Sequence, residues 1–551
     1  MKKLFDSIFK ELGYENDTRI IKSNNADYQC DDLFNLAKLY HKSPKEIGDE
    51  VVEKINSLDN FDMYFKEVIF SFPGFININV SDKYICNELR KLMEKDILGA
   101  KKENKKIVLD YGGPNVAKPL QVGHLRSAVI GQAINNILKF VGNETIADVH
   151  LGDFGLQMGQ VIYGILNDFE NVDDADINLD YLNKTYPKIS ALCKENEDVK
   201  KECLLITKEL QEGNAKYRNL WKKICDVSIK DIKEIYNYLY IDFDLWLGES
   251  DAYKYFDELF KVLEGNIRDD DGAKIIDVKE ETDKIEVPPC IVQKSDGAYL
   301  YATSDLGTIY QRNKDYKPDN IIYVTDNRQS MHFMQVFRAA KKSKLYEGVF
   351  EHYGFGTVNG SDNKPFKTRT GGTMKLKDLI SDVKKEFINI REENKLMDES
   401  DVDIIVNAII KFADLQNDLE RNYIFDIKKF SEVNGKTGPY ILYTYLRINK
   451  LLDKKGGVIS DTIYSITDRD LRLKLLEVSG VINESVKQRK PHFIANYLYE
   501  LCTVANNFYQ NNRVIDLEGK QRDDFEVLLG YNNEVIKVLL ELLGIKLPKK
   551  M

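Results

Sequence analysis

The sequence is poor in cysteine, and the placement of its few cysteines excludes two classes of protein. There are seven among 551 residues, an odd number. They are scattered and never form a Cys-x-x-Cys pair: Cys30, Cys86, Cys193, Cys203, Cys225, Cys290 and Cys502. A disulfide-stapled secreted domain and a zinc site both need paired, closely spaced cysteines. The pattern instead fits a reduced, cytoplasmic protein.

Long apolar runs are also missing. No stretch approaches the roughly 20 apolar residues that a membrane-spanning helix needs. The opening residues, MKKLFDSIFKELGYEND, lack both a continuous apolar segment and a small-residue cleavage site, so we expect no signal peptide. We therefore predict that the protein has no membrane partner.

Positive charge is not in excess. The formal net charge is −10, which argues against polyanion binding over the whole surface but leaves a local basic groove open. Glycine (33) and proline (12) are modest, and a hydrophobic content of 43% with 30% charged residues indicates packed cores rather than disorder. The length suggests about three or four domains.

What is present begins with a small α/β pattern in residues 1–100. Residues 31–55 carry apolar side chains at helical spacing, with Ser43 and Pro44 placed as the N-cap and first residue of a second helix. Residues 67–81, EVIFSFPGFININVS, alternate like two strands around a Pro-Gly turn. We interpret this part as a packing or folding module rather than a catalytic one.

A strand–helix–strand series follows. Residues 105–113 form a short apolar run that closes on glycines, typical of a buried parallel strand. Residues 124–142 read as a helix with small side chains, and residues 144–155 as a second strand and turn. Such a βαβ unit predicts an α/β fold with a parallel, Rossmann-type sheet, in which ligands bind at the carboxyl ends of the strands. Residues 320–327 predict a further buried strand.

The remaining chain predicts the other parts. Residues from about 165 to 290 are acidic and helical, and we interpret them as an insertion. From about residue 381 the pattern is nearly all helical, which indicates a helical bundle. The predicted domains are therefore residues 1–100, a catalytic domain at 101–380 and a helical domain at 381–551.

Residues 110–127, DYGGPNVAKPLQVGHLRS, join the first strand to its helix. This is either an ordinary crowded turn or a loop built around a phosphate-bearing ligand. A helix N-terminus offers free backbone N–H groups, Gly123 lets a flat ring or phosphate approach the backbone, and His124 and Lys118 can donate to developing negative charge. Because the cluster follows a buried strand, we favour the ligand.

This stretch resembles the first signature of class I aminoacyl-tRNA synthetases, in the extended form found in arginyl-tRNA synthetases. Other stretches look like that family's blocks in the right order: residues 27–38, 72–79, 149–159, 245–250, 299–312, 323–337, 364–380, 434–447 and 542–551. The resemblance implies that arginine attacks the α-phosphate of ATP to give arginyl-adenylate, and that the terminal adenosine of tRNA(Arg) then takes the arginyl group. It also implies Mg²⁺ accompanying the ATP, no tightly bound cofactor and a monomer. In the sequence itself, no carboxylate cluster looks like a dedicated protein metal site, so we expect none.

The amino-acid site is predicted partly by chemistry and partly by this resemblance. An arginine pocket must neutralise a planar cation, which carboxylates do best. Asp305 lies four residues after Tyr301 and shares its helix face. By similarity we assign Asp305, Glu249 and Tyr301 to the guanidinium group. The residues that match positions holding the amino and carboxyl groups are Asp110, Asn115 and Gln329.

The nucleotide site is predicted by similarity as well. Residues 364–369, KPFKTR, resemble the family's second signature, whose Lys364 and Lys367 would close on the pyrophosphate, with Lys118 on the opposite side. The predicted catalytic residues are Lys118, Gln121, His124, Lys364 and Lys367. Val122 and Gly123 are predicted to contact ATP together with His124 and the two lysines of the second signature.

Recognition of tRNA is predicted at the two ends of the chain. The helical domain would hold the anticodon stem and loop, with exposed aromatic side chains stacking on bases. The candidates are Tyr440, Tyr443 and Arg447, although aromatics at this spacing also fit a packed core. The N-terminal module would contact the tRNA elbow.

The sequence departs from the family's pattern at several positions. Gln121 stands where the first signature usually has His, and Asp110 where Glu is more usual. Gly112 and Gly113 replace common serines, and Leu419 replaces a frequent Arg. Two rivals follow: a nucleotidyltransferase on the same core, which would not need the helical domain, and a non-charging paralogue that binds tRNA or arginine.

Overall fold

The computed structural model describes residues 1–15, 17–172, 176–360, 362–364, 366, 374–390, 397–452 and 458–551. Contacts divide the chain into two compact units. Unit 1 comprises Met1–Gly99, Arg447–Ser479 and Glu500–Val535. Unit 2 comprises Ala100–Leu446, Gly480–Tyr499 and Ile536–Met551. The three domains predicted from the sequence, residues 1–100, 101–380 and 381–551, remain a prediction.

Unit 1 contains an antiparallel sheet with the strand order β1-β2-β4-β3. Its strands are β1 (Ile20–Lys22), β2 (Tyr28–Cys30), β3 (Phe65–Ser71) and β4 (Phe75–Val80). The predicted strand pair around the Pro-Gly turn is therefore confirmed. Its helices before residue 100 are α1 (Lys2–Glu11), α2 (Leu33–Tyr40), α3 (Pro44–Asn56), α4 (Phe61–Tyr64), α5 (Asp82–Met93) and η1 (Asp96–Gly99).

Helix α3 begins where the sequence predicted. The hydroxyl of Ser43 accepts the Glu46 backbone N–H, and the Glu46 carboxylate accepts the Ser43 backbone N–H. This capping box satisfies two N–H groups that the first helical turn leaves free. The later helix α19 (Ile466–Leu476) packs on α5 in the same unit.

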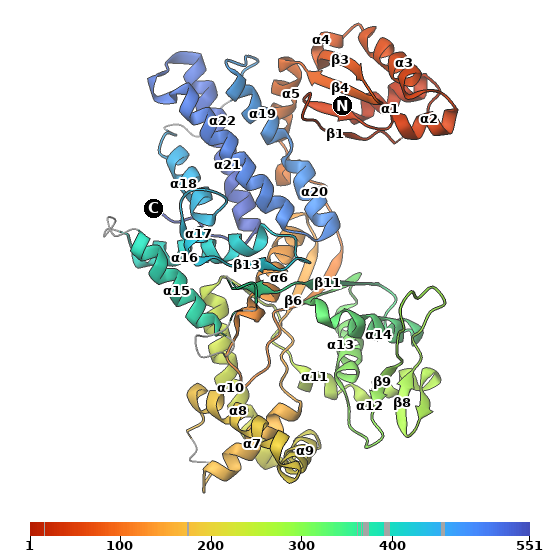
Figure 1. The fold of residues 1–551 in the computed structure, drawn as a ribbon, viewed down its shortest axis with the longest axis vertical. Helices are drawn as coiled ribbons and strands as arrows, with labels where there is room; N and C mark the ends of the chain where they lie inside the picture. Colours follow the sequence, from red (N-terminus) through yellow and green to blue (C-terminus); the bar gives the residue numbers. More distant parts are fainter. Residues whose placement is uncertain are drawn as a thin grey trace. The chain divides into compact units, whose positions relative to one another are not determined.

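Unit 2 is built around a four-stranded parallel sheet with the order β11-β10-β5-β6. Its two outer strands, β6 and β11, are labelled in Figure 1. Its strands are β5 (Lys106–Tyr111), β6 (Glu144–Asp148), β10 (Asn320–Asp326) and β11 (Val349–Phe355). Helix α6 (Val122–Phe140) joins β5 to β6 and packs on the sheet. The predicted parallel βαβ unit is confirmed, and so is the strand at residues 320–327.

The side chains of α6 explain its buried position. Ala128, Gly131 and Ala133 let the helix approach the sheet, and a Cβ at Gly131 would overlap the Tyr111 ring. Arg126 on the same helix is buried and pairs with Asp414 at 3.1 Å. It also donates to the backbone oxygens of Gly356 and Arg421. Arg126 thereby ties the start of α6 to the helical part of unit 2.

The insertion differs in one respect from its prediction. Its helices are α7 (Leu156–Asp168), α8 (Leu179–Glu195), α9 (Glu197–Gln211), α10 (Ala215–Tyr238), α11 (Glu249–Tyr253), α12 (Phe256–Leu263) and η2 (Glu264–Asn266). Figure 1 shows α7 to α10 gathered in one group. The sequence missed a three-stranded antiparallel sheet made of β7 (Arg268–Asp270), β8 (Ala273–Ile276) and β9 (Cys290–Gln293). These strands are three or four residues long, too short to give a clear alternating pattern.

The rest of the chain is mainly helical, as predicted. The four-stranded parallel sheet is flanked by α13 (Tyr301–Tyr316), η3 (Asn327–Gln329) and α14 (Ser330–Lys342). The later elements are β12 (Val358–Asn359), α15 (Leu376–Ile390), α16 (Glu399–Leu415), β13 (Tyr423–Ile424), α17 (Ile427–Ser431), α18 (Gly438–Asn449), α20 (Val478–Gln488), α21 (His492–Asn512), η4 (Val514–Asp516) and α22 (Gly519–Leu542). Within the described part of the chain, no helix combines the length and apolar character needed to cross a membrane.

Candidate active site

Three polar side chains lie in register across three neighbouring strands, close to the carboxyl ends of β5 and β6. Asp110 on β5 is in register with Asp148 on β6 and with Tyr323 on β10. Register partners in a parallel sheet point to the same face. The three side chains therefore share the face of the sheet on which Arg312 of α13 lies, since Arg312 contacts all of them.

Arg312 holds the two carboxylates together. Its Nη2 donates to Asp110 Oδ2 at 2.6 Å and to Asp148 Oδ2 at 2.7 Å. Its guanidinium carbon lies 5.3 Å from the centre of the Tyr323 ring. Burial raises the pKa of Asp110, and the charge of Arg312 opposes that rise. Asp110 is thus a buried carboxylate whose position is fixed by its partner.

Asp110, Asp148 and His150 bring one ligand atom each within 4.8 Å of one another. Three such atoms would suit a metal ion. However, the guanidinium of Arg312 already occupies both carboxylates as their counter-cation. The group therefore fits a charge-paired cluster better than a resident metal site.

Glu249 reaches this region because the chain before it runs beside the end of β6. Gly248 forms a parallel bridge with Leu151, and the backbone N–H of Glu249 donates to Leu151 O at 3.0 Å. The pKa of Glu249 is raised to about 7, mainly by burial, with Asp153 and Asp305 acting in the same direction and His150 against them. The interaction of Glu249 with Asp305 shows that the two predicted guanidinium ligands lie near each other.

Asp305 already has a partner from a neighbouring helix. His332 on α14 forms a hydrogen bond with Asp305, with 2.5 Å between His332 Nε2 and Asp305 Oδ2. Burial acts to lower the pKa of His332, but the hydrogen bond and charge of Asp305 outweigh it and the pKa is raised. The sequence interpretation gave His332 a packing role, whereas its ring contacts a predicted ligand.

Tyr301, one turn before Asp305 on α13, is 67% exposed. Its pKa is raised by partial burial and by the charge of Glu249. The ring is therefore near Glu249 while most of its surface faces outward. Spacings of four and seven residues place Tyr301, Asp305 and Arg312 on one face of α13.

The other two predicted amino-acid ligands lie at the same edge of the sheet. Asn115 forms a bridge with Gly152, and its Oδ1 accepts from Gln157 Nε2 at 3.4 Å. Gln329 is exposed in the turn that follows β10. Asn115 is thus held by the backbone that follows β6, whereas Gln329 is open to solvent.

His124 is fixed in one orientation at the start of α6. Its Nδ1 accepts the backbone N–H of Gln121 at 2.9 Å. Burial and the charge of Lys118 lower the pKa of His124 to about 4. The ring is therefore neutral near pH 7, and since Nδ1 accepts, the proton lies on Nε2, which is left to donate.

Two kinds of glycine shape the loop. A Cβ at Gly123 would meet no atom within 4 Å, so open space lies above the helix start. Gly113 is different, because a Cβ there would lie 2.5 Å from the backbone oxygen of His150. Gly112 has a φ of +71°, which a serine adopts only with strain. The departure at residue 112 is therefore explained by its left-handed backbone, and the departure at residue 113 by the close approach of the backbone that follows β6.

The segment that follows the second signature, residues 374–376, is hydrogen-bonded to the residues around the start of α6. Val122 N donates to Met374 O at 3.1 Å, and Leu376 N donates to Leu120 O at 2.8 Å. The segment after the second signature thus runs antiparallel to the start of α6. Lys364 is exposed in a turn closed by Gly360 N donating to Lys364 O. Lys367 lies outside the described residues.

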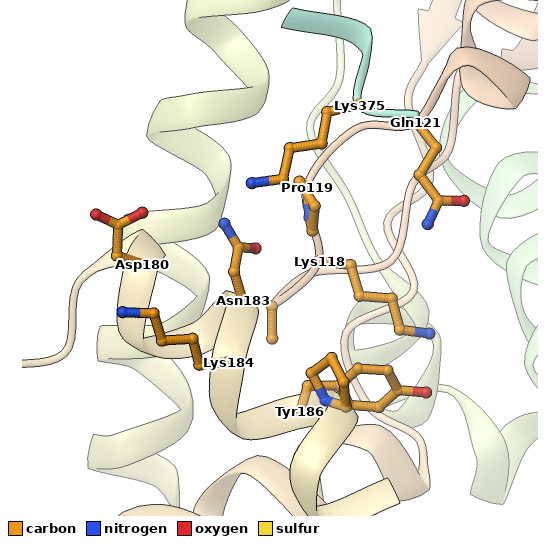
Figure 2. A pocket seen from close by; sticks show the side chains of 10 residues that line it. Lys118, Pro119, Gln121, Asp180, Asn183, Lys184, Tyr186 and Lys375 are labelled. Atoms are coloured by element: carbon orange, nitrogen blue, oxygen red, sulfur yellow. The ribbon is translucent and has the colours of Figure 1, made fainter. Parts of the chain in front are cut away.

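A cavity of about 340 Å³ lies between this loop and helix α8 of the insertion (Figure 2). The ammonium of Lys118 lies 4.3 Å from the centre of the Tyr186 ring. Lys375 extends across the cavity toward Asn183 in Figure 2. The lining also includes Gln121 but neither Glu249 nor Asp305. The cationic cavity and the acidic region are therefore separate parts of unit 2.

The predicted tRNA contacts lie on α18. Tyr443 is 41% exposed. Tyr440 is half-buried, with its ring centre 5.6 Å from that of Tyr499. In unit 1, the guanidinium of Arg447 lies 4.0 Å from the centre of the Tyr509 ring. Tyr443 offers an open stacking face, whereas Tyr440 and Arg447 are engaged with other aromatic rings.

The sequence interpretation missed three residues of the cluster: Asp148, His150 and Arg312. All three lie in or beside stretches that resembled the family's blocks, but their residue types alone gave no role. The usable signal was spacing. Arg312 lies seven residues after Asp305 on a predicted helix, and Asp148 ends the strand paired with the one that carries Asp110.

Three sequence profiles match this chain. The profile described as "tRNA synthetases class I (R), catalytic domain" matches residues 88–427. "Arginyl tRNA synthetase N terminal domain" matches residues 1–80, and "DALR anticodon binding domain" matches residues 441–551. These matches and the fold define a class I aminoacyl-tRNA synthetase.

Individual relatives narrow the class. The arginine–tRNA ligase of Alkaliphilus oremlandii is 39% identical over 99% of this chain and 98% of its own length. The crystal structure of arginyl-tRNA synthetase from Plasmodium falciparum superposes with a TM-score of 0.84 at 25% identity, covering 100% of this chain and 98% of its own. The Thermus thermophilus arginyl-tRNA synthetase shares the fold, with a TM-score of 0.82 at 20% identity, covering 100% of this chain and 99% of its own.

The chain belongs to the arginyl-tRNA synthetase family. The predicted fold class and the predicted aminoacyl-tRNA ligase class are confirmed. The family's activity is the ATP-dependent attachment of arginine to tRNA.

Proposed function

We propose that this chain charges tRNA(Arg) in two steps at the carboxyl edge of its parallel sheet. A carboxylate oxygen of arginine attacks the α-phosphorus of ATP, and the bond to pyrophosphate breaks. The 2′-hydroxyl of the terminal adenosine then attacks the arginyl carbonyl carbon, and AMP leaves. The observation that carries the proposal is the meeting of several acidic side chains at this edge, beside a helix N-terminus with open space above it.

The acidic side chains suit a substrate with two positive charges. Glu249 and Asp305 would accept from the guanidinium group, with Tyr301 closing over it. A guanidinium bound at Asp305 would replace the hydrogen bond that His332 forms with this carboxylate. Asp110 and Asn115 would hold the amino group and Gln329 the carboxylate.

The start of α6 suits the nucleotide. Val122 and Gly123 would contact the nucleoside, because a Cβ is absent where the open space begins. The Nε2–H of His124 would donate to the α-phosphate as negative charge develops there. A neutral donor with a fixed tautomer needs no proton uptake before each turnover.

The cationic cavity suits the leaving group. Lys118 and Gln121 lie on one wall, and Lys375 follows the second signature. We place the pyrophosphate near Lys118, with Lys364 and Lys367 closing over it. Mg²⁺ would arrive on the phosphates of ATP, since it usually binds through phosphate oxygens and few protein ligands.

The remaining assignments concern the partner RNA and the setting of the protein. Tyr440, Tyr443 and Arg447 would contact tRNA, of which Tyr443 has the most open face. We propose a monomer in the cytoplasm.

The test is ATP–pyrophosphate exchange with arginine and tRNA present. An arginyl-tRNA synthetase exchanges label under these conditions, whereas a non-charging paralogue shows none above background. Asp305→Asn should raise the arginine KM by about tenfold or more, because one charge-assisted contact with the guanidinium is lost. An unchanged KM would remove Asp305 from the guanidinium site.

A further inference from the structure

Asp110, Asp148 and Arg312, which we call the Asp110 cluster, contain more negative than positive groups. Two carboxylates, Asp110 and Asp148, share a single Nη2 of Arg312 at 2.6 and 2.7 Å. With both acids ionised and the guanidinium charged, Asp110, Asp148 and Arg312 carry a net charge of −1. The ring of His150 lies beside the two carboxylates and leaves this count unchanged as long as it is neutral. A buried cluster with a net charge is unfavourable unless a further charge of opposite sign completes it.

The three side chains differ in their access to solvent. The side chain of Asp110 is 9% exposed, while those of Asp148 and Arg312 are each 1% exposed. Asp110 is therefore the member that can touch a ligand, and Asp148 lies behind it.

Hydrogen bonding around the cluster is incomplete. Arg312 Nε and Nη1 and the Tyr323 hydroxyl are buried without a well-formed hydrogen bond among the described residues, although the Tyr323 hydroxyl lies close enough to the guanidinium to interact with it. The side chains of Arg312 and Tyr323 are 1% and 2% exposed. Buried polar atoms usually find partners, so this network is arranged for an additional polar group. The two Arg312 nitrogens can only donate, so they would need an acceptor and do not favour a cation. A cation is favoured instead by the two carboxylates that share one guanidinium.

We propose that Asp148 is a positioning residue that makes Asp110 able to bind the α-ammonium group of arginine. Asp148 draws on the charge of Arg312, so Asp110 keeps negative charge for the substrate. The inference rests on the proposed function and adds to it a residue that does not touch the substrate.

The role of Asp148 follows from comparing the cluster with and without its charge. Without the charge of Asp148, Arg312 and Asp110 would form an ordinary neutral ion pair. An ammonium group entering beside that pair would meet the guanidinium charge as well as the carboxylate and would gain little. With Asp148 ionised, the ammonium group becomes the second cation for two anions, and the cluster is neutral when substrate is bound.

The test compares Asp148→Asn with the wild-type enzyme, using inhibition of pyrophosphate exchange by two arginine analogues. Agmatine keeps the amino group but lacks the carboxylate, and δ-guanidinovaleric acid keeps the carboxylate but lacks the amino group. The variant should bind arginine and agmatine about tenfold more weakly, or worse, which is the order expected for one lost charge contact. Binding of δ-guanidinovaleric acid should stay within about twofold. Equal weakening of all three ligands would indicate a merely structural role, and no weakening would exclude any role; either result overturns the inference.

Two further variants keep the test decisive. Arg312→Gln with Asp148→Asn restores a net charge of −1 and removes a buried ion pair, so the double variant should regain the preference for agmatine that Asp148→Asn loses. Failure to regain it, with the protein folded, also overturns the inference. Asp319→Asn removes an equal charge at the opposite end of the same strands, where Asp319 accepts the Lys106 backbone N–H, and should leave both analogues unchanged. Absence of arginine-dependent exchange in the wild-type enzyme would instead refute the proposed function.

Discussion

Glu249 provides the sharpest prediction, because its ionisation is tied to binding of a cation. Its pKa of about 7 stands well above the ordinary 4.5 for a glutamate. At about 1.4 kcal/mol per pKa unit, ionising Glu249 in the empty pocket costs about 3 kcal/mol more than in water. A bound guanidinium stabilises the carboxylate and lowers the pKa, so arginine binding should release a proton below pH 7.

The magnitude follows from the fraction ionised. Roughly one Glu249 in eleven is ionised at pH 6 and about ten in eleven at pH 8, given a pKa of about 7. Because the pKa is raised in the free enzyme, arginine affinity should be full above pH 7 and fall as the pH drops through that value. The apparent Kd should therefore be about tenfold weaker at pH 6 than at pH 8.

Isothermal titration calorimetry of arginine in buffers with different ionisation heats measures both the Kd and the protons released. Glu249→Gln should bind arginine more weakly at pH 8 and lose most of the pH dependence. His332 contributes in the same direction, because its raised pKa lets the protonated ring compete for Asp305 at low pH, so His332→Gln separates that part. Glu264→Gln, at an exposed glutamate, is the control. A wild-type Kd that is flat from pH 6 to 8, or an unchanged slope in Glu249→Gln, would refute the reasoning.

Three more predictions concern other parts of unit 2. Gly123→Ala should raise the ATP KM about tenfold, because the added methyl enters the space proposed for the nucleotide, and should not lower the unfolding temperature, because that space is open in the free protein. Gly480→Ala, at another exposed helical position with open space, should leave the ATP KM unchanged, and equal ATP KM values in the two variants would contradict the prediction. Tyr186→Leu removes the ring beneath the Lys118 ammonium and should raise the ATP KM severalfold while the arginine KM stays constant; a rise in the arginine KM alone would assign the ring elsewhere. Asp414→Asn leaves the buried Arg126 without its anionic partner and should destabilise the protein by about 3 kcal/mol. Calorimetric unfolding should show a lower midpoint temperature. An unchanged midpoint would mean that the backbone oxygens around the guanidinium are enough to stabilise its charge.

Much of the fold was predictable because its signals are local. The apolar run of β5, the glycines that end it and the small residues of α6 lie within some 30 consecutive positions and specify a strand, a turn and a helix. The capping box at Ser43 needs only four residues. The short strands β7 to β9 were missed because their pairing depends on partners rather than on their own pattern.

The candidate site divides in the same way. The sequence by itself determined which residue types lie at the strand ends and helix start, including Asp110, His124 and Asp305. Only the tertiary structure decided what these side chains contact: Arg312 reaches Asp110 across 202 positions and Asp148 across 164, and Tyr186 of the insertion lies against Lys118. The physical reason is that a helix or strand is stabilised by neighbours along the chain, whereas the charge and pKa of a buried group depend on whichever distant side chains the packing brings within a few ångströms.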